Sequence, residues 1–236
     1  MGFLSNKISK EQLQAGDHIY TWRFCLLNES LCLGSFLAGI YIGDNNVIHF
    51  AAQGGSEIDT TTISNKLLSS FVPQDSFRCS GCGLNAENNN GVRVSDLDSF
   101  LNGGKLYRFE YGVDKMTFFV HLRGGTCTLV QADPAEDVLH RAKVLCETGF
   151  GRYDLLQNNC EDFVIYCKTG LVVMNQIQGG RSGPVNALRS LLRSGDSVDY
   201  VRSKYQVDLS NRKDVVKVAV EDLPVKLGWS SSSTFV

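Results

Sequence analysis

A tight turn between two apolar segments constrains the fold of this chain more than any other feature. Residues 39–43 (Gly-Ile-Tyr-Ile-Gly) and 47–50 (Val-Ile-His-Phe) flank the polar residues 44–46 (Asp-Asn-Asn). Asp and Asn tolerate the positive φ angles of a tight turn, and β-branched residues on either side favour extended strands. The pattern therefore predicts an antiparallel β-hairpin.

Other segments predict a larger sheet and a first helix. Residues 16–22 have the pattern of a turn that leads into a strand. A helix is expected over Pro134–Glu147, because Asp133 is a good N-cap and Glu136 completes a capping box, and Gly149 ends it. Apolar and β-branched runs predict further strands at Leu106–Tyr111, Thr117–Leu122 and Thr126–Val130.

Length and charge narrow the function classes. The chain has 236 residues, enough for one domain with a buried core. Its formal net charge of -2 gives no electrostatic basis for nucleic-acid binding, which favours strongly basic faces. The sequence has no run near the ~18 apolar residues of a membrane-spanning helix and no secretory signal. We therefore expect a cytoplasmic protein, free or at the periphery of a membrane, whose eight cysteines are reduced thiols.

Cys160 stands at the predicted start of a second helix. Asn159 is a capping residue before the thiol, and this helix is expected to stop before Gly170. Unpaired N–H groups and the helix dipole favour a thiolate at such a position, whereas the two acidic residues that follow oppose it. Two interpretations follow, a nucleophile or a packed cysteine, and packed cysteines are the more common.

His49 lies on the second strand of the predicted hairpin. Alternation places its side chain on the face of Val47 and Ala51, opposite Ile48 and Phe50. A neutral imidazole on a rigid strand has the geometry to contact a thiol on a packed helix, as in Cys–His catalysis. The alternative is a histidine that serves only the core or the edge of the sheet.

Several motifs occur in a characteristic order along the chain. They are Gly16–Arg23, Tyr41–Asp44 with Val47–His49, Arg123–Leu129, Asn159–Phe163 and Tyr166–Leu171. Together they resemble the lecithin retinol acyltransferase (LRAT) domain family, and most closely its plant members. The resemblance covers about residues 8–183, which leaves 184–236 as a C-terminal extension that we expect to be partly disordered.

The resemblance implies an α+β fold of the permuted papain-like (NlpC) type, with an antiparallel sheet packed against helices. It also implies a thiol acyltransferase or acylhydrolase that takes an acyl group from a phospholipid and needs no cofactor. By position Cys160 is the nucleophile that carries the acyl thioester, and His49 is the third, orienting group. A phospholipid or another acyl donor is the expected partner, and the oligomeric state stays open.

One position departs from the family pattern. The family's general-base histidine lies twelve residues before the one that His49 matches, and Leu37 occupies that position here. Leucine cannot accept a proton, and general-base catalysis typically contributes ~10²–10⁴-fold. His18 on the neighbouring strand is the nearest substitute. The chain is therefore expected to be either an attenuated enzyme or a non-catalytic lipid-binding or interaction module that retains the fold.

The same region differs in length. Residues 24–38 form a longer link than the family usually has, and their sequence is unlike it. We hypothesise that this stretch arises from an alternative splice junction or a mispredicted exon edge. Sequencing the transcript checks this, because a message that encodes the stretch as printed removes the second explanation.

Two further features concern metals and membranes. Cys79 and Cys82 form a C-x-x-C pair, which is half of a zinc knuckle, but a second pair is missing, so a reduced dithiol is the favoured reading. Gly2 narrowly misses the N-myristoylation pattern. A short helix is expected over Pro184–Arg193, with an apolar stripe that either rests on a membrane surface or packs on its own domain. Its members are Val185, Leu188, Leu191 and Leu192.

Overall fold

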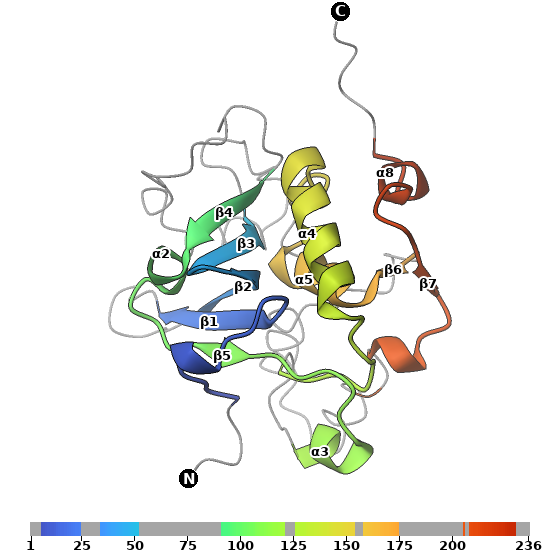
Figure 1. The fold of residues 1–236 in the computed structure, drawn as a ribbon. Helices are drawn as coiled ribbons and strands as arrows, with labels where there is room; N and C mark the ends of the chain where they lie inside the picture. The colour runs from blue at the N-terminus through green and yellow to red at the C-terminus, as the bar shows by residue number, and fades with distance from the viewer. Residues whose placement is uncertain are drawn as a thin grey trace, which may run out of the picture.

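A five-stranded antiparallel sheet with helices on both faces forms the body of the protein (Figure 1). The computed structural model describes residues 6–24, 34–51, 91–120, 126–153, 158–174, 205 and 208–229. The strand order is β4-β3-β2-β1-β5, and every neighbouring pair is antiparallel. The strands are β1 (His18–Phe24), β2 (Gly34–Gly43), β3 (Asn46–Phe50), β4 (Val92–Asp96) and β5 (Tyr107–Arg108). The predicted α+β class is confirmed, while the permuted papain-like arrangement stays a prediction.

The helices are short apart from two. They are η1 (Lys10–Gln12), α2 (Leu97–Leu101), α3 (Lys115–Val120), α4 (Ala135–Thr148), α5 (Cys160–Thr169), η3 (Leu209–Asn211) and α8 (Leu223–Lys226). A second sheet pairs β6 (Leu171–Val173) with β7 (Val215–Lys217). Within the described ranges, no helix is both long and apolar enough to cross a membrane.

The predicted hairpin is confirmed as β2 and β3. Asp44 and Asn45 adopt φ angles of 48° and 61°, the left-handed conformation that a two-residue turn requires. The chain enters β1 through Gly16, whose φ of 93° also fits the predicted turn. These residues form the turn because their short polar side chains, or the lack of one, permit positive φ.

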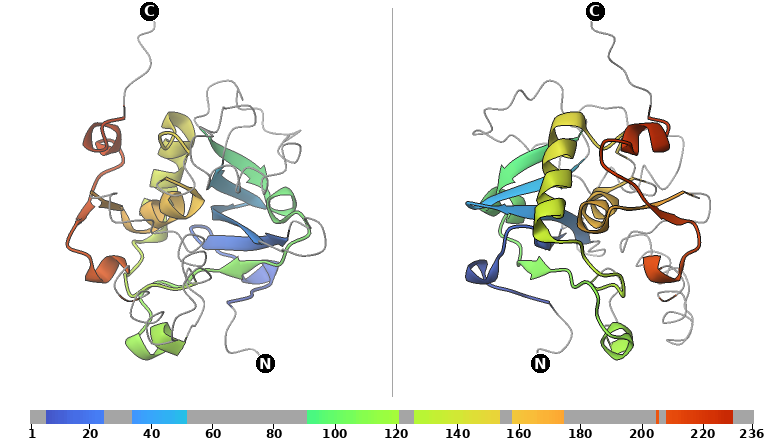
Figure 2. Two further views of the ribbon diagram at one scale, coloured as in Figure 1. Left: turned by 180° about the vertical axis from the view of Figure 1, so that it is seen from behind. Right: turned by 45° about the vertical axis from the view of Figure 1, so that its right-hand side comes forward.

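The two faces of the sheet pack against different helices (Figure 2). Phe50 in β3 contacts Phe163 of α5, with ring centroids 6.2 Å apart. Its neighbour His49 points the other way and contacts Phe100 of α2, at 5.6 Å. Because side chains alternate along a strand, α4 and α5 cover the face of Phe50, and α2 covers the face of His49.

The helix α5 begins and ends where the sequence predicts. The side-chain oxygen of Asn159 accepts hydrogen bonds from the backbone N–H groups of Glu161 and Asp162, at 2.9 and 3.4 Å. The Asp162 carboxylate in turn accepts from Asn159 N, which completes a capping box. Gly170 ends the helix with a φ of 65°.

The helix α4 is confirmed, but its predicted N-terminal capping box is wrong. The N-cap residue is Pro134, without a side-chain hydrogen bond, and Gly149 ends the helix as expected. The carboxylate of Asp133 accepts hydrogen bonds from Arg141 and Lys217 instead, each at 2.6 Å. Asp133 therefore pairs with Arg141 of α4 itself and with Lys217 of β7 instead of capping the helix.

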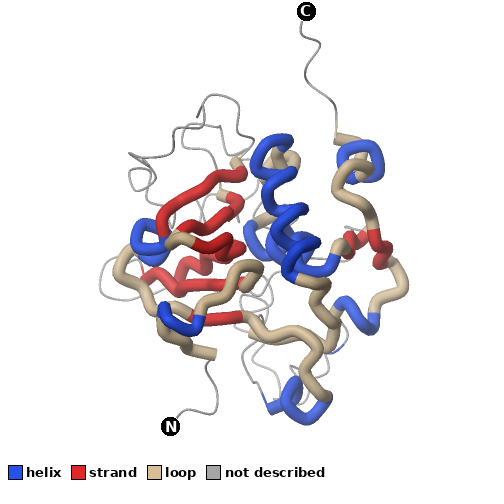
Figure 3. The backbone as a smooth tube through the Cα atoms, in the orientation of Figure 1, coloured by secondary structure: helices blue, strands red, loops and turns tan. Residues whose placement is uncertain are grey.

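Two of the predicted strands are wrong, and a third is shorter than expected. Over residues 117–120 the chain is part of α3, because the Asp114 carboxylate accepts from the N–H and hydroxyl of Thr117 and caps a helical turn. Residues 126–130 run as a loop with one bridge, between Cys127 and Glu110 (Figure 3). Of residues 106–111, only Tyr107–Arg108 is regular strand. These apolar segments pair with too few neighbouring strands to form a continuous ladder of hydrogen bonds.

Residues 208–229 pack into the main core of the domain. Val218, Val220 and Leu223 are buried in the same cluster as the sheet and α5, and the Tyr166 hydroxyl donates to the Val218 carbonyl at 3.0 Å. The predicted boundary at residue 183 stays a prediction. The helix expected over residues 184–193, the tail at 230–233, and Cys79 with Cys82 lie outside the described residues.

Candidate active site

Cys160 is the first residue of α5 and lies against strand β2. Its side chain is almost buried, with 4% of the residue exposed. The backbone N–H groups of Ala38 in β2 and of Glu161 lie close enough to the thiol to lower its pKa. The thiol therefore sits between a helix N-terminus and the sheet, the position that the sequence predicts for it.

This position does not activate the thiol by itself. Burial raises the pKa of Cys160 to about 12, and the carboxylates of Glu161 and Asp162 act in the same direction. The N–H donors from Ala38 and Glu161 lower the pKa but do not offset burial. At pH 7 a thiol with such a pKa is protonated. Nucleophilic chemistry here requires a base.

His49 is fully buried on the opposite side of the β2–β3 ladder from α5. Its Nε2 lies 2.9 Å from the hydroxyl oxygen of Ser95, and its ring contacts Phe100 edge-on. Ser95 and Phe100 belong to β4 and α2, so distant parts of the sequence fix the imidazole. Neither Ser95 nor Phe100 was predicted as a neighbour of His49, because no local sequence pattern marks them.

Strand β2 contacts both the start of α5, which carries the thiol, and β3, which carries the imidazole. Ala38, whose N–H contacts Cys160, is followed by Gly39, which pairs with His49 across the ladder. A Cβ atom on Gly39 would lie 2.5 Å from Val47 Cγ1 and 3.1 Å from the Phe100 ring, so glycine permits this close approach. The catalytic pairing of Cys160 with His49 stays a prediction.

Leu37, at the position where the resemblance predicts the family's base, lies on the same face of the sheet as His49. It is 7% exposed and belongs to the core. It pairs with Thr21 in β1, whose buried hydroxyl has no hydrogen-bond partner among the described residues. An unsatisfied buried hydroxyl is unusual in a native core. A polar side chain at position 37 would therefore meet a group able to hydrogen-bond it.

His18 lies on the other face and is not brought together with His49. It pairs with Ile40, its ring stacks on Phe109 with centroids 4.6 Å apart, and its Nδ1 is 2.9 Å from the Tyr111 hydroxyl. Burial, together with the charge of Lys168, holds the pKa of His18 well below its usual value. The imidazole is therefore neutral. Its expected role as a substitute base for Cys160 stays a prediction.

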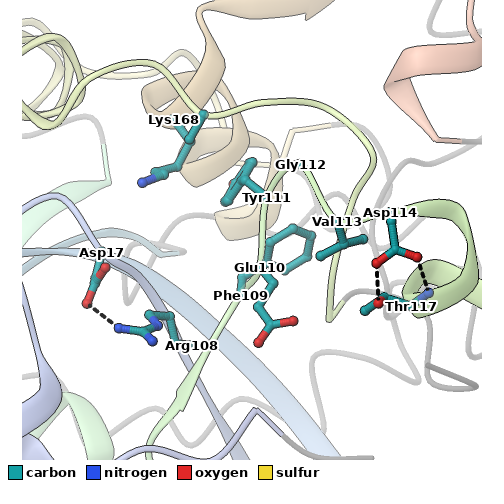
Figure 4. A pocket seen from close by; sticks show the side chains of 11 residues that line it. Asp17, Arg108, Phe109, Glu110, Tyr111, Gly112, Val113, Asp114, Thr117 and Lys168 are labelled. Carbon is teal, nitrogen blue, oxygen red and sulfur yellow. Dashed lines mark hydrogen bonds and ion pairs between the residues drawn. The ribbon is translucent and has the colours of Figure 1, made fainter. Parts of the chain in front are cut away.

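A pocket of about 600 Å³ lies near His18, between the β5 segment, α3 and the C-terminal end of α5 (Figure 4). Lys168 of α5 reaches into it, donates to the Gly16 carbonyl at 3.0 Å, and lies 5.3 Å from the centre of the Tyr111 ring. Arg108 contacts Asp17 on another wall, at 3.5 Å. The sequence did not predict this pocket, because its walls come from segments far apart in the chain. Among the described residues, no group of three potential metal ligands occurs.

Comparison with known proteins agrees with the motifs. The model of the lecithin retinol acyltransferase family matches residues 11–173. Protein LEAD-SENSITIVE 1 of Arabidopsis thaliana is 42% identical over 248 residues, which cover 96% of this chain and 92% of that protein. No solved structure matches the chain. With the family model matching well over half of its residues, the chain belongs to the lecithin retinol acyltransferase family.

Proposed function

We propose that this protein handles acyl lipids, with Cys160 as the acceptor of an acyl group from a phospholipid and with a rate held down by the absence of a base at position 37. The observation that carries this proposal is the position of the thiol, at the tip of α5 and against the β2 backbone at Ala38. Family membership supports the acyl-transfer chemistry.

The covalent step needs a proton acceptor and a proton donor. The Cys160 sulfur would attack the ester carbonyl, form a thioester and release the glycerol oxygen as a hydroxyl. The thiol proton must leave for this to occur, and a base within hydrogen-bond reach normally takes it. Leu37 cannot, and His49 lies on the opposite side of the β2–β3 ladder from α5, so the thiol would lose its proton at a rate below that of a complete triad.

The second candidate is a non-catalytic lipid-binding or interaction module. It is favoured by the raised pKa of Cys160, about 12, which leaves the thiol protonated at neutral pH. In that case the fold binds a lipid at the membrane surface or another partner, and the cysteine serves as a core residue.

Trapping the acyl group separates the two candidates. The full-length protein and its Cys160→Ala variant are incubated with phosphatidylcholine vesicles or with a soluble activated ester, and intact masses are measured. The catalytic proposal expects an acyl adduct in the first protein and none in the second. No adduct from either donor would refute it and leave the non-catalytic module.

A further inference from the structure

The short helix α3 carries three large apolar side chains that are exposed. Met116 is 77% exposed, Val120 52% and Phe119 37%, although all three are large hydrophobic residues. The helix is nevertheless anchored, because Phe118 is buried and its ring contacts Tyr205, at 6.4 Å. In Figures 1 and 2, α3 projects from the body of the protein at the end opposite α8. An anchored helix thus carries an apolar cluster of Met116, Phe119 and Val120, in which Met116 and Val120 are the most exposed and the Phe119 ring also contacts Tyr205, at 5.6 Å.

The size of this cluster argues against a protein partner. Its exposed surface amounts to a few hundred Å², against roughly 800 Å² per partner in a stable protein–protein interface. A six-residue helix has no complementary groove of its own to add. A lipid bilayer needs neither a large area nor a matching shape, because its acyl chains adapt to inserted side chains.

The polar surroundings of α3 point to the type of lipid surface. Asp114 and Thr117, at the start of α3, also line the pocket that holds Lys168 and Arg108. The pocket therefore presents both positive and negative groups beside the apolar cluster, and these can pair with the two opposite charges of a zwitterionic headgroup. The chain as a whole carries a formal charge of -2, which gives no attraction toward an anionic surface.

We propose that α3 docks the protein on a zwitterionic lipid bilayer, with Met116, Phe119 and Val120 inserted below the headgroups and the adjacent pocket facing them. The choice of lipid rests on the proposed function. The surface itself does not depend on any chemistry at Cys160.

Flotation with phosphatidylcholine vesicles tests the proposal on the full-length protein. The double variant Met116→Ser/Val120→Ser should lose at least tenfold in vesicle binding, because two exposed apolar side chains leave the interface. Val225→Ser is the matched control, since Val225 in α8 is 87% exposed but lies away from α3. It should bind as the unchanged protein does. Circular dichroism confirms that all three proteins are folded.

Vesicle binding is also measured at high salt, on anionic vesicles and with the Cys160→Ala variant. Binding should persist in 0.5 M salt and should be no stronger on vesicles that contain phosphatidylglycerol, because apolar insertion is not screened. The Cys160→Ala variant should still bind, which separates failure of the docking surface from failure of the acyl chemistry. Equal binding by the double variant overturns the proposal. A lack of vesicle binding by the unchanged protein overturns it as well, and a concentration-dependent dimer that the double variant abolishes would then assign the surface to self-association.

Discussion

On one face of the sheet Phe50 lies among the rings of Phe150 and Phe163, whereas on the other face His49 hydrogen-bonds Ser95 beside Phe100. The first face supplies packing, and its one histidine, His18, is neutral and engaged with Tyr111. The second face buries the polar groups of His49, Ser95 and Thr21. Leu37 lies on this second face and pairs with Thr21.

The largest expected effect is on the packed face. Phe163→Ala removes a fully buried ring that contacts both Phe50 and Phe150. The free energy of unfolding should fall by about 3–5 kcal/mol, because the lost burial is combined with an unfilled cavity. Urea denaturation measures it. A loss below about 1 kcal/mol would mean that this face is loosely packed.

On the polar face the corresponding change is smaller. Ser95→Ala removes the hydroxyl that lies 2.9 Å from His49 Nε2. We expect the free energy of unfolding to fall by about 1–3 kcal/mol, the usual penalty for taking away one partner of a buried hydrogen bond. The same denaturation experiment checks it. An unchanged stability would remove the distinction between the two faces.

The buried His18 also allows a pH test. The pKa of His18 is lowered by burial, so the folded protein leaves it neutral while the unfolded chain protonates it below about pH 6.5. His18 therefore makes stability fall as the pH drops below that value, by at most ~1.4 kcal/mol per pH unit, and contributes nothing above it. His18→Gln should have a flatter profile between pH 6.5 and 5 in urea denaturation. Parallel profiles for the two proteins would contradict the buried, neutral assignment.

The smallest change concerns the helix that presents the thiol. Asn159→Ala removes the side-chain oxygen that accepts from Glu161 N and Asp162 N. A lost N-cap typically destabilises by ~1 kcal/mol. Because the cap orders the first turn, amide hydrogen exchange at the start of α5 should also accelerate, whereas that of β2 should not. Uniform acceleration across the protein would show that the cap has no local role.

Local chemistry explains which parts of the fold were predictable from sequence. The turn at Asp44 and Asn45 and the capped helix that starts at Cys160 each depend on a few adjacent residues, and both were predicted correctly. The segment 117–120 was not, because its apolar and β-branched residues suit a strand until the Asp114 carboxylate caps a helical turn.

The surroundings of the site depend on contacts far apart in the sequence. Alternation gave the face of His49, but Ser95 lies 46 residues away and carries no local sign of its role. The pocket near α3 is assembled in the same way, from β5, α5 and the segment before β1. Strand pairing brings such distant residues together, and the partners of each strand cannot be read from a single sequence.

The central claim is that Cys160 is an acyl acceptor whose rate is held down by the absence of a base at position 37. The most direct test is the rate of acyl-adduct formation on Leu37→His, measured by intact mass with a soluble activated ester, beside Leu37→Asn and Leu37→His/Cys160→Ala. The account predicts a ~10²–10⁴-fold faster adduct for Leu37→His, no gain for the asparagine variant, and no adduct without the thiol. Folded Leu37→His protein that reacts no faster than the unchanged chain would contradict it.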